Sequence, residues 1–96
     1  MTKSLAVEFR PYGIRVLALA PTLIDTPGIA VLREQAKKAA GGAPIGDLLE
    51  QLAIREPLGR AGVPDDVARV ALFCASDLSM LMTGSTLLVD AGDVAL

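Results

Sequence analysis

The chain has 96 residues, enough for one small domain, and its 9 basic and 11 acidic side chains give a net charge of −2 at pH 7. This balance provides no basic surface for nucleic acid or an anionic membrane, and no apolar run is long enough to span a bilayer. The absence of histidine and the single cysteine exclude histidine catalysis, an internal disulfide and a Cys/His metal site within the chain. We therefore expect a cytoplasmic protein with no nucleic-acid, membrane or metal partner.

Apolar residues make up 52% of the chain although only 3% are aromatic, so Ala, Leu, Val and Ile supply nearly all of the apolar surface. Either the domain is an unusually apolar small one, or much of its surface is covered by something else. We favour the second interpretation.

The first predicted element is a helix from Thr2 to Arg10, with Leu5, Ala6 and Phe9 at helical spacing. About nine residues are too few for an independently stable helix, which needs about 12–15. The pattern fits either a short helix held by packing or the last turns of a longer one.

A buried strand is predicted from Ile14 to Ala20, because the run is apolar apart from Arg15 and has no polar alternation. We expect Pro21 to end the strand, since proline has no N–H to donate. Asp25-Thr26 before Pro27 is typical of a helix start. Ligands of α/β proteins bind beyond the carboxyl ends of such strands, so residues 21–26 form the candidate binding loop.

Two helices are predicted next, from Pro27 to Ala40 and from about Gly46 to Arg55, separated by Gly41-Gly42-Ala43-Pro44. The first should bury Ile29, Leu32, Ala36 and Ala39 or Ala40, and the second carries Leu48, Leu49, Leu52 and Ala53. We interpret Lys37-Lys38 as part of a solvated face. Two helices around such a break suggest a hinged flap.

A loop from Pro57 to Val63 leads to a helix that begins at Pro64 and ends near Ser76-Asp77. The carboxylates of Asp65 and Asp66 suit the positive end of the helix dipole, which explains them without a metal or an acid/base role. The helix should bury a stripe formed by Val67, Val70, Ala71 and Cys74.

Ser85 to Val89 predicts a second buried strand, followed by a short tail, residues 90–96, that should dock on a partner. Two parallel strands joined by helices cannot cover both faces of a sheet, so we expect further sheet beside the first strand.

The ordered motifs resemble those of the short-chain dehydrogenase/reductase family over nearly the whole chain. They are Tyr12-Gly13-Ile14-Arg15-Val16, Ala20-Pro21, Ile24-Asp25-Thr26, Pro57-Leu58-Gly59-Arg60, Pro64-Asp65-Asp66-Val67-Ala68, Ala75-Ser76-Asp77 and Thr83-Gly84-Ser85-Thr86-Leu87-Leu88-Val89-Asp90-Ala91-Gly92. The resemblance implies an α/β fold, the C-terminal part of a Rossmann-type doubly wound parallel sheet. Residues 1–96 would be a C-terminal fragment of an NAD(P)-binding domain, with a substrate flap at about 27–56.

Family members also carry a glycine-rich phosphate loop, a serine and a Tyr-x-x-x-Lys pair, and none of these motifs occurs in the chain. The only tyrosine, Tyr12, is followed four residues later by Val16. We therefore expect no catalytic residue here, and binding of NAD or NADP only together with the missing N-terminal half.

The resemblance implies that backbone groups around Pro21, Thr22, Leu23 and Ile24 bind the nicotinamide carboxamide. The Thr26 hydroxyl would lie near the carboxamide or pyrophosphate, unless it only caps the next helix. The family usually has glycine where Thr22 and Ala91 stand, and often asparagine where Leu17 stands. Threonine adopts a positive φ at a cost, so this loop is expected to run differently.

The function expected from the resemblance is a portion of an NAD(P)-dependent oxidoreductase that interconverts alcohols and ketones. The chain would supply the nicotinamide-side loop, the substrate flap and, through the helix from Pro64 and the strand to Val89, the interface of a homotetramer or dimer. Aspartate at Leu87 or Val89 should then lower the oligomeric mass. The alternative is a non-catalytic truncated remnant, or an assembly module that binds intact relatives.

Overall fold

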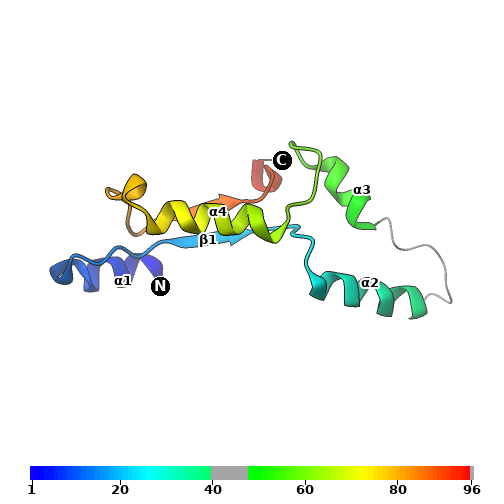
Figure 1. Ribbon diagram of the computed structural model, residues 1–96, viewed down its shortest axis with the longest axis horizontal. Coiled ribbons are helices and arrows are strands. Elements are labelled where there is room, and N and C mark those ends of the chain that lie inside the picture. Colours follow the sequence, from blue (N-terminus) through cyan, green and yellow to red (C-terminus); the bar gives the residue numbers. More distant parts are fainter. Residues whose placement is uncertain (40–47, 96) are drawn as a thin grey trace. The chain divides into compact units, whose positions relative to one another are not determined.

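The computed structural model describes residues 1–39 and 48–95, which divide into two compact units. The first unit contains residues 1–21 and 65–89, and the second contains residues 22–64 and 90–96 as far as they are described. Figure 1 labels most of the helices and strands of both.

The first unit contains a parallel two-stranded sheet of β1 (Ala18–Pro21) and β2 (Thr86–Val89), in which Ala18 lies opposite Thr86. The predicted α/β fold, in which helices join two parallel strands, is therefore confirmed. The predicted start of the first strand at Ile14 is wrong. Before Ala18 the backbone pairs with a loop, since the Val16 N–H donates to Thr83 Oγ1 at 3.0 Å.

The strand ends at Pro21, as expected, although Pro21 is itself the last residue of β1, opposite Val89, and the predicted last residue was Ala20. The Ala18 N–H donates to the carbonyl of Ser85, the residue before β2, at 3.0 Å. The N–H and C=O groups of successive strand residues point to opposite sides, so those of Ala20 point toward β2 and the C=O of Pro21 points away from it. Proline is tolerated on that side because its missing N–H removes no bond to β2.

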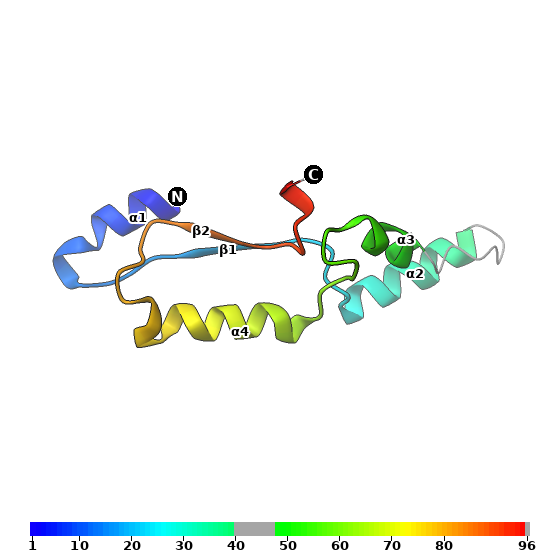
Figure 2. The same ribbon diagram turned by 90° about the horizontal axis from the view of Figure 1, so that it is seen from above.

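Helices lie on opposite sides of this sheet, as Figure 2 shows. These helices are α1 (Thr2–Glu8) and α4 (Pro64–Ala75). All of α4 except its first residue, Pro64, belongs to the first unit. Ala6 of α1 is buried, and a Cβ added to Gly84 would lie 3.4 Å from its Cβ. The first predicted helix is shorter than expected, because a 3₁₀ helix η1 (Arg10–Tyr12) follows it and ends at the left-handed Gly13.

Arg15 ties the end of α4 to the chain that leads into β1. Its guanidinium donates to the carbonyls of Cys74 at 2.8 Å and Ser79 at 3.0 Å, and to the Ser79 hydroxyl at 3.1 Å. Ser79 ends the 3₁₀ helix η2 (Asp77–Ser79) and is only 1% exposed. A helix leaves its last carbonyls without partners inside the helix, and here Arg15 and the Ser79 hydroxyl both donate to the Cys74 carbonyl of α4.

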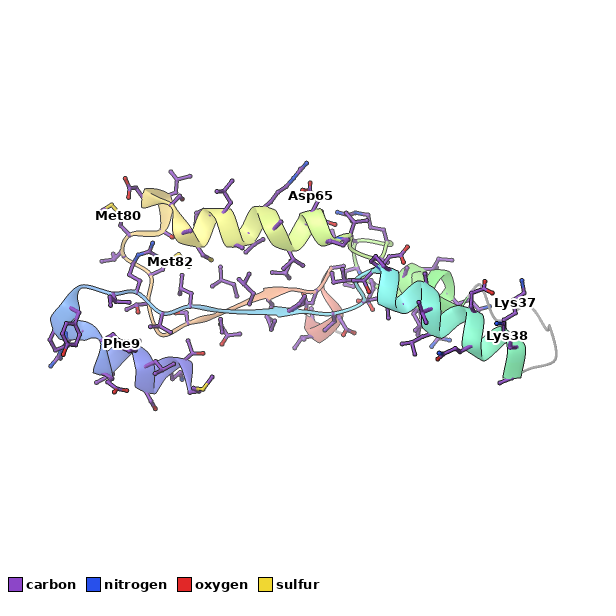
Figure 3. The ribbon with its side chains drawn as sticks, turned by 60° about the horizontal axis from the view of Figure 1, so that its bottom comes forward. Phe9, Lys37, Lys38, Asp65, Met80 and Met82 are labelled. Atoms are coloured by element: carbon purple, nitrogen blue, oxygen red, sulfur yellow. The ribbon has the colours of Figure 1, made fainter. Side chains whose placement is uncertain are left out.

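The predicted inner stripe of α4 is correct in three positions of four. Val67, Val70 and Cys74 are half-buried, whereas Ala71 is exposed because it lies at the margin of the apolar stripe. Asp65 lies on the exposed surface at the helix start (Figure 3), where its carboxylate accepts from Arg69 Nε at 2.8 Å.

The second unit contains α2 (Pro27–Ala39), α3 (Leu48–Arg55) and the 3₁₀ helix η3 (Asp93–Ala95). The predicted break at 41–44 and the predicted helix start at Gly46 lie outside the described residues. Ile29 is half-buried, but Leu32 is 58% exposed and Ala39 is exposed, so their predicted burial is wrong. Lys37 and Lys38 are exposed, as expected (Figure 3). Ala53 of α3 is buried.

Candidate functional site

The backbone after β1 contains a residue in the left-handed region. Leu23 has φ +51°, whereas Thr22 is not among the described residues with positive φ. The family's glycine position, where threonine would adopt a positive φ only at a cost, is Thr22. The left-handed conformation is instead adopted one position later, by Leu23. A non-glycine residue in this region costs about 1–2 kcal/mol, so the loop needs support from elsewhere.

Gly62 supplies that support. Its N–H donates to the Leu23 carbonyl at 3.0 Å, and its carbonyl accepts from the Asp25 N–H at 2.8 Å. Ile24 and Gly62 form an isolated parallel bridge between these two bonds. The loop from Leu23 to Asp25 is therefore held in a fixed shape by a residue 38 positions after Ile24, from 62 minus 24.

The other strained residue of the second unit is held by the same connecting segment. Ala91 has φ +54°, so alanine here retains a strain that glycine would avoid, roughly 1 kcal/mol. Its carbonyl accepts from the Leu58 N–H at 3.2 Å. Gly92 has φ +94° and lies against Pro57, where a Cβ would come within 2.6 Å of the proline ring. Residues 57–62 therefore clamp both left-handed positions.

Thr22 has a buried hydroxyl oxygen that has no hydrogen-bond partner within residues 1–39 and 48–95. A buried polar atom without a partner costs about 1–3 kcal/mol, which a polar ligand would recover. A hydroxyl can donate one hydrogen bond and accept two. An unsatisfied hydroxyl next to a rigid strained loop fits a polar group such as a carboxamide.

Thr26 caps α2, because its hydroxyl oxygen accepts from the Ile29 N–H at 3.3 Å. This is the capping role that the sequence left open as an alternative to cofactor binding. The hydroxyl hydrogen is not used by that bond and can still be donated to a ligand. Capping and ligand binding are thus compatible in Thr26.

Three carboxylates of the second unit influence one another. The backbone N–H groups of Val94 and Gly92 donate to Asp90 at 3.1 Å each and hold the pKa of this carboxyl below its ordinary value. Burial raises the pKa of Glu56, and the charges of Asp93 and Asp90 raise it further. Across the described ranges, no group of three or more acidic or cysteine side chains has the geometry of a metal site.

The five predicted site residues are distributed along one continuous stretch of chain. Pro21 ends β1, Thr22 to Ile24 lie in the loop, and Thr26 caps the start of α2. Tyr12 belongs to η1 of the first unit and is 74% exposed, with its ring centroid 6.3 Å from that of Phe9. The sequence did not point to Gly62 as a site residue, although a glycine in a connecting loop can signal close backbone contact.

Known proteins share both this sequence and this fold. A family model described as enoyl-(acyl carrier protein) reductase matches residues 1–93. A 3-oxoacyl-[acyl-carrier-protein] reductase of Chlamydia pneumoniae is 48% identical over 91 residues, which are 95% of this chain and 32% of that protein. An NAD-dependent glycerol dehydrogenase of Listeria innocua is 42% identical, over 96% of this chain and 32% of its own length.

A solved structure of a short-chain dehydrogenase family protein from Francisella tularensis covers the whole chain with a TM-score of 0.87 at 33% identity, over 39% of that protein. The chain belongs to the short-chain dehydrogenase/reductase family and corresponds to a C-terminal region of its members. It spans about a third of the length of the curated relatives that it matches. None of the helices in its described parts could cross a membrane.

Proposed function

We propose that the chain is a portion of an NAD(P)-dependent oxidoreductase that interconverts alcohols and ketones. Family membership supports the reaction class. The observation that supports the chain's own part in it is the loop at residues 22–25, where a buried unpartnered hydroxyl adjoins a left-handed backbone held by Gly62. A preformed loop with an unsatisfied polar group suits a polar ligand.

The proposed role of this loop is to hold the nicotinamide half of the cofactor. The backbone groups of Pro21 to Ile24 and the Thr22 hydroxyl would bind the carboxamide, and the Thr26 hydroxyl would donate its free hydrogen nearby. The bound cofactor supplies hydride transfer. The proton exchange with substrate belongs to residues outside this chain, since the motif Tyr-x-x-x-Lys does not occur in it.

Residues 27–56 form the proposed substrate flap. Val31 and Leu32 of α2 are 57% and 58% exposed, and Leu52 of α3 is 39% exposed. Exposed apolar side chains on two helices fit a segment that closes over a small alcohol or ketone.

A chimeric enzyme tests the proposed loop function. The chain replaces the matching 91 residues of the reductase of Chlamydia pneumoniae, and Thr22 is changed to Val. We expect the unchanged chimera to reduce a ketone with NADH or NADPH. Thr22→Val should weaken cofactor binding roughly tenfold, as for the loss of one hydrogen bond. Cofactor affinity is read by fluorescence titration as well as by turnover.

Thr86→Val is the matched control, because Thr86 is an exposed threonine of β2. It should leave cofactor affinity unchanged. Equal affinity in both variants would overturn the role of Thr22, and a folded chimera that binds cofactor without turnover would contradict the proposed activity.

The alternative function is a non-catalytic remnant or assembly module that binds intact relatives. The exposed side chains of Leu72 and Leu88, 71% and 58% exposed, favour an assembly surface. Binding of the 96-residue chain to an intact relative, together with an inactive chimera, would favour this alternative.

A further inference from the structure

An open groove lies between α1 and the segments that lead into β1 and β2, all of which belong to the first unit. Figure 2 shows α1 and these two segments on the same end of the sheet. The volume of the groove is about 520 Å³, within the range of about 300–1,000 Å³ that is typical of small-molecule sites. None of the five residues proposed for cofactor binding lines it.

The floor of the groove is apolar and held by backbone contacts. Ala6 and Val7 of α1 contribute to it, and a Cβ added to Gly84 would lie 3.4 Å from the Ala6 Cβ. The Gly84 N–H donates to the Val16 carbonyl at 2.7 Å, which ties together the segments that lead into the two strands. Val7 and Ile14 are 67% and 50% exposed, so the floor offers apolar surface to a ligand.

Basic side chains surround this floor. Three of the nine lining residues are basic, namely Lys3, Arg10 and Arg15, and none is acidic. The Arg15 guanidinium donates to carbonyl oxygens, which carry no net charge, so its positive charge is retained. Lys3 and Arg10 are exposed, and neither pairs with a carboxylate in the described parts of the chain. The groove therefore favours a negatively charged ligand.

The size of the groove favours a small molecule over a larger partner. Its nine lining residues are fewer than the roughly 20–30 that each side of a stable protein interface contributes. Its three cations are fewer than the roughly 4–8 that bind an anionic lipid surface. A ligand that matches both the floor and the charge has an apolar chain and one anionic group.

We propose that this groove binds a small amphiphile with an apolar chain and a carboxylate head, such as a medium-chain fatty acid. The apolar chain lies on Ala6, Val7 and Ile14, and the carboxylate pairs with Lys3 or Arg10. The site acts by binding alone, with no bond made or broken. The proposal depends neither on hydride transfer nor on the cofactor loop, so it stands even if the proposed oxidoreductase activity fails.

Titration of the 96-residue chain with octanoate, followed by amide chemical shifts in NMR spectra, tests the site. We expect the largest shifts at Lys3, Val7 and Gly84 and none in α2. Octan-1-ol keeps the apolar chain and lacks the charge, so it should bind about fivefold more weakly, as for the loss of one exposed ion pair. Acetate keeps the charge and lacks the chain, so it should not bind measurably.

Variants on α1 locate the bound molecule. Val7→Glu places a like charge on the apolar floor and should weaken octanoate binding at least about tenfold. Val31→Glu is the matched control, because Val31 is 57% exposed on α2 and does not line the groove. Lys3→Met and Arg10→Met each remove one cation and should weaken binding about three- to fivefold, whereas Lys37→Met should not change it.

Three outcomes would overturn the proposal. The first is octan-1-ol that binds as tightly as octanoate, which would leave only an apolar surface. The second is a set of shifts outside the groove, or equal losses of affinity in Val7→Glu and Val31→Glu. The third is binding by the chain that is lost in the chimeric enzyme, which would show that further chain of the enzyme covers the groove. Shift mapping uses the unchanged chain, so it decides even if a variant fails to fold.

Discussion

Leu23 and Ala91 are the two non-glycine residues with positive φ in the described chain, and neighbours along residues 57–62 hold both. Left-handed backbone at a non-glycine residue persists only where other contacts determine it. Here those contacts are backbone hydrogen bonds from Leu58 and Gly62. The strain is thus held by main chain, which tolerates side-chain substitution at the clamp better than a side-chain contact would.

Ionisation of Glu56 opposes folding. Its carboxylate oxygen Oε2 is buried without a hydrogen-bond partner in the described structure, and burial, Asp93 and Asp90 raise its pKa. A raised pKa means that the folded state binds the proton more tightly than the unfolded state. The contribution of Glu56 to stability is therefore most favourable below its ordinary pKa and is lost as the pH rises through the folded value.

Glu56→Gln removes the charge and keeps the size of the side chain. We expect this variant to unfold at a higher urea concentration than the parent at pH 7. The difference should shrink as the pH falls toward 4.5, the ordinary pKa of this group. Urea titrations at both pH values measure it, with Glu34→Gln on the exposed face of α2 as the control. A variant less stable than the parent at pH 7 would contradict the prediction.

At the scale of the element, Arg15 replaces a conventional cap at the end of α4. The guanidinium contacts the carbonyls of Cys74, Ser76, Ser79 and Met82 and the Ser79 hydroxyl. The turn that follows presents Leu78, Met80 and Leu81 to solvent, 81%, 69% and 100% exposed. Met80 lies on the outer side of this turn and Met82 on its inner side (Figure 3).

Arg15→Met should destabilise the chain by about 2–3 kcal/mol, because it removes the hydrogen bonds of a charged donor to the carbonyls of Cys74 and Ser79, which keep only the Ser79 hydroxyl and the Met82 N–H as donors. Urea unfolding followed by circular dichroism gives this value. Arg69→Met is the matched control, since Arg69 and Asp65 form an exposed pair with side chains 78% and 65% exposed. That change should cost at most about 0.5 kcal/mol. Equal losses in the two variants would refute the capping role of Arg15.

The sequence predicted the elements and their order because their signals are local. No tertiary contact is needed to recognise the Asp-Thr-Pro sequence at the start of α2 or the apolar run before Pro21. Arg15 could be seen as a charge inside an apolar run, but its partners lie about sixty residues later and follow from no local rule. The sequence did not predict the hydrogen bonds from Gly62 or the left-handed backbone of Leu23 for the same reason, since both depend on a bridge between distant segments.

On the scale of the whole molecule, the proposed oligomer uses the outer face of β2 together with α4. The sequence suggested Leu87 or Val89 as its contact residues, but the structure shows both half-buried and Leu88 58% exposed. Leu87 and Val89 share a face because side chains alternate along a strand. Aspartate at either position would therefore disturb folding as well as assembly.

Leu88→Asp tests the interface without this complication. In the chimeric enzyme it should reduce the mass from that of a tetramer or dimer to a smaller species, because it places a charge in an apolar contact. Light scattering after gel filtration measures the mass. Leu58→Asp, at a residue 69% exposed in the other unit, should leave the mass unchanged. An unaltered mass for Leu88→Asp would exclude this face.

The pairing of Ala18 with Thr86 has a kinetic consequence. The two residues are 68 positions apart in the sequence, from 86 minus 18, so every contact of the sheet closes a long loop. Loop closure of this length is a slow step in folding, and sheets built from such contacts form late. During synthesis β1 leaves the ribosome long before its partner strand exists. An apolar strand whose edge toward β2 is still unpaired is a natural substrate for a chaperone.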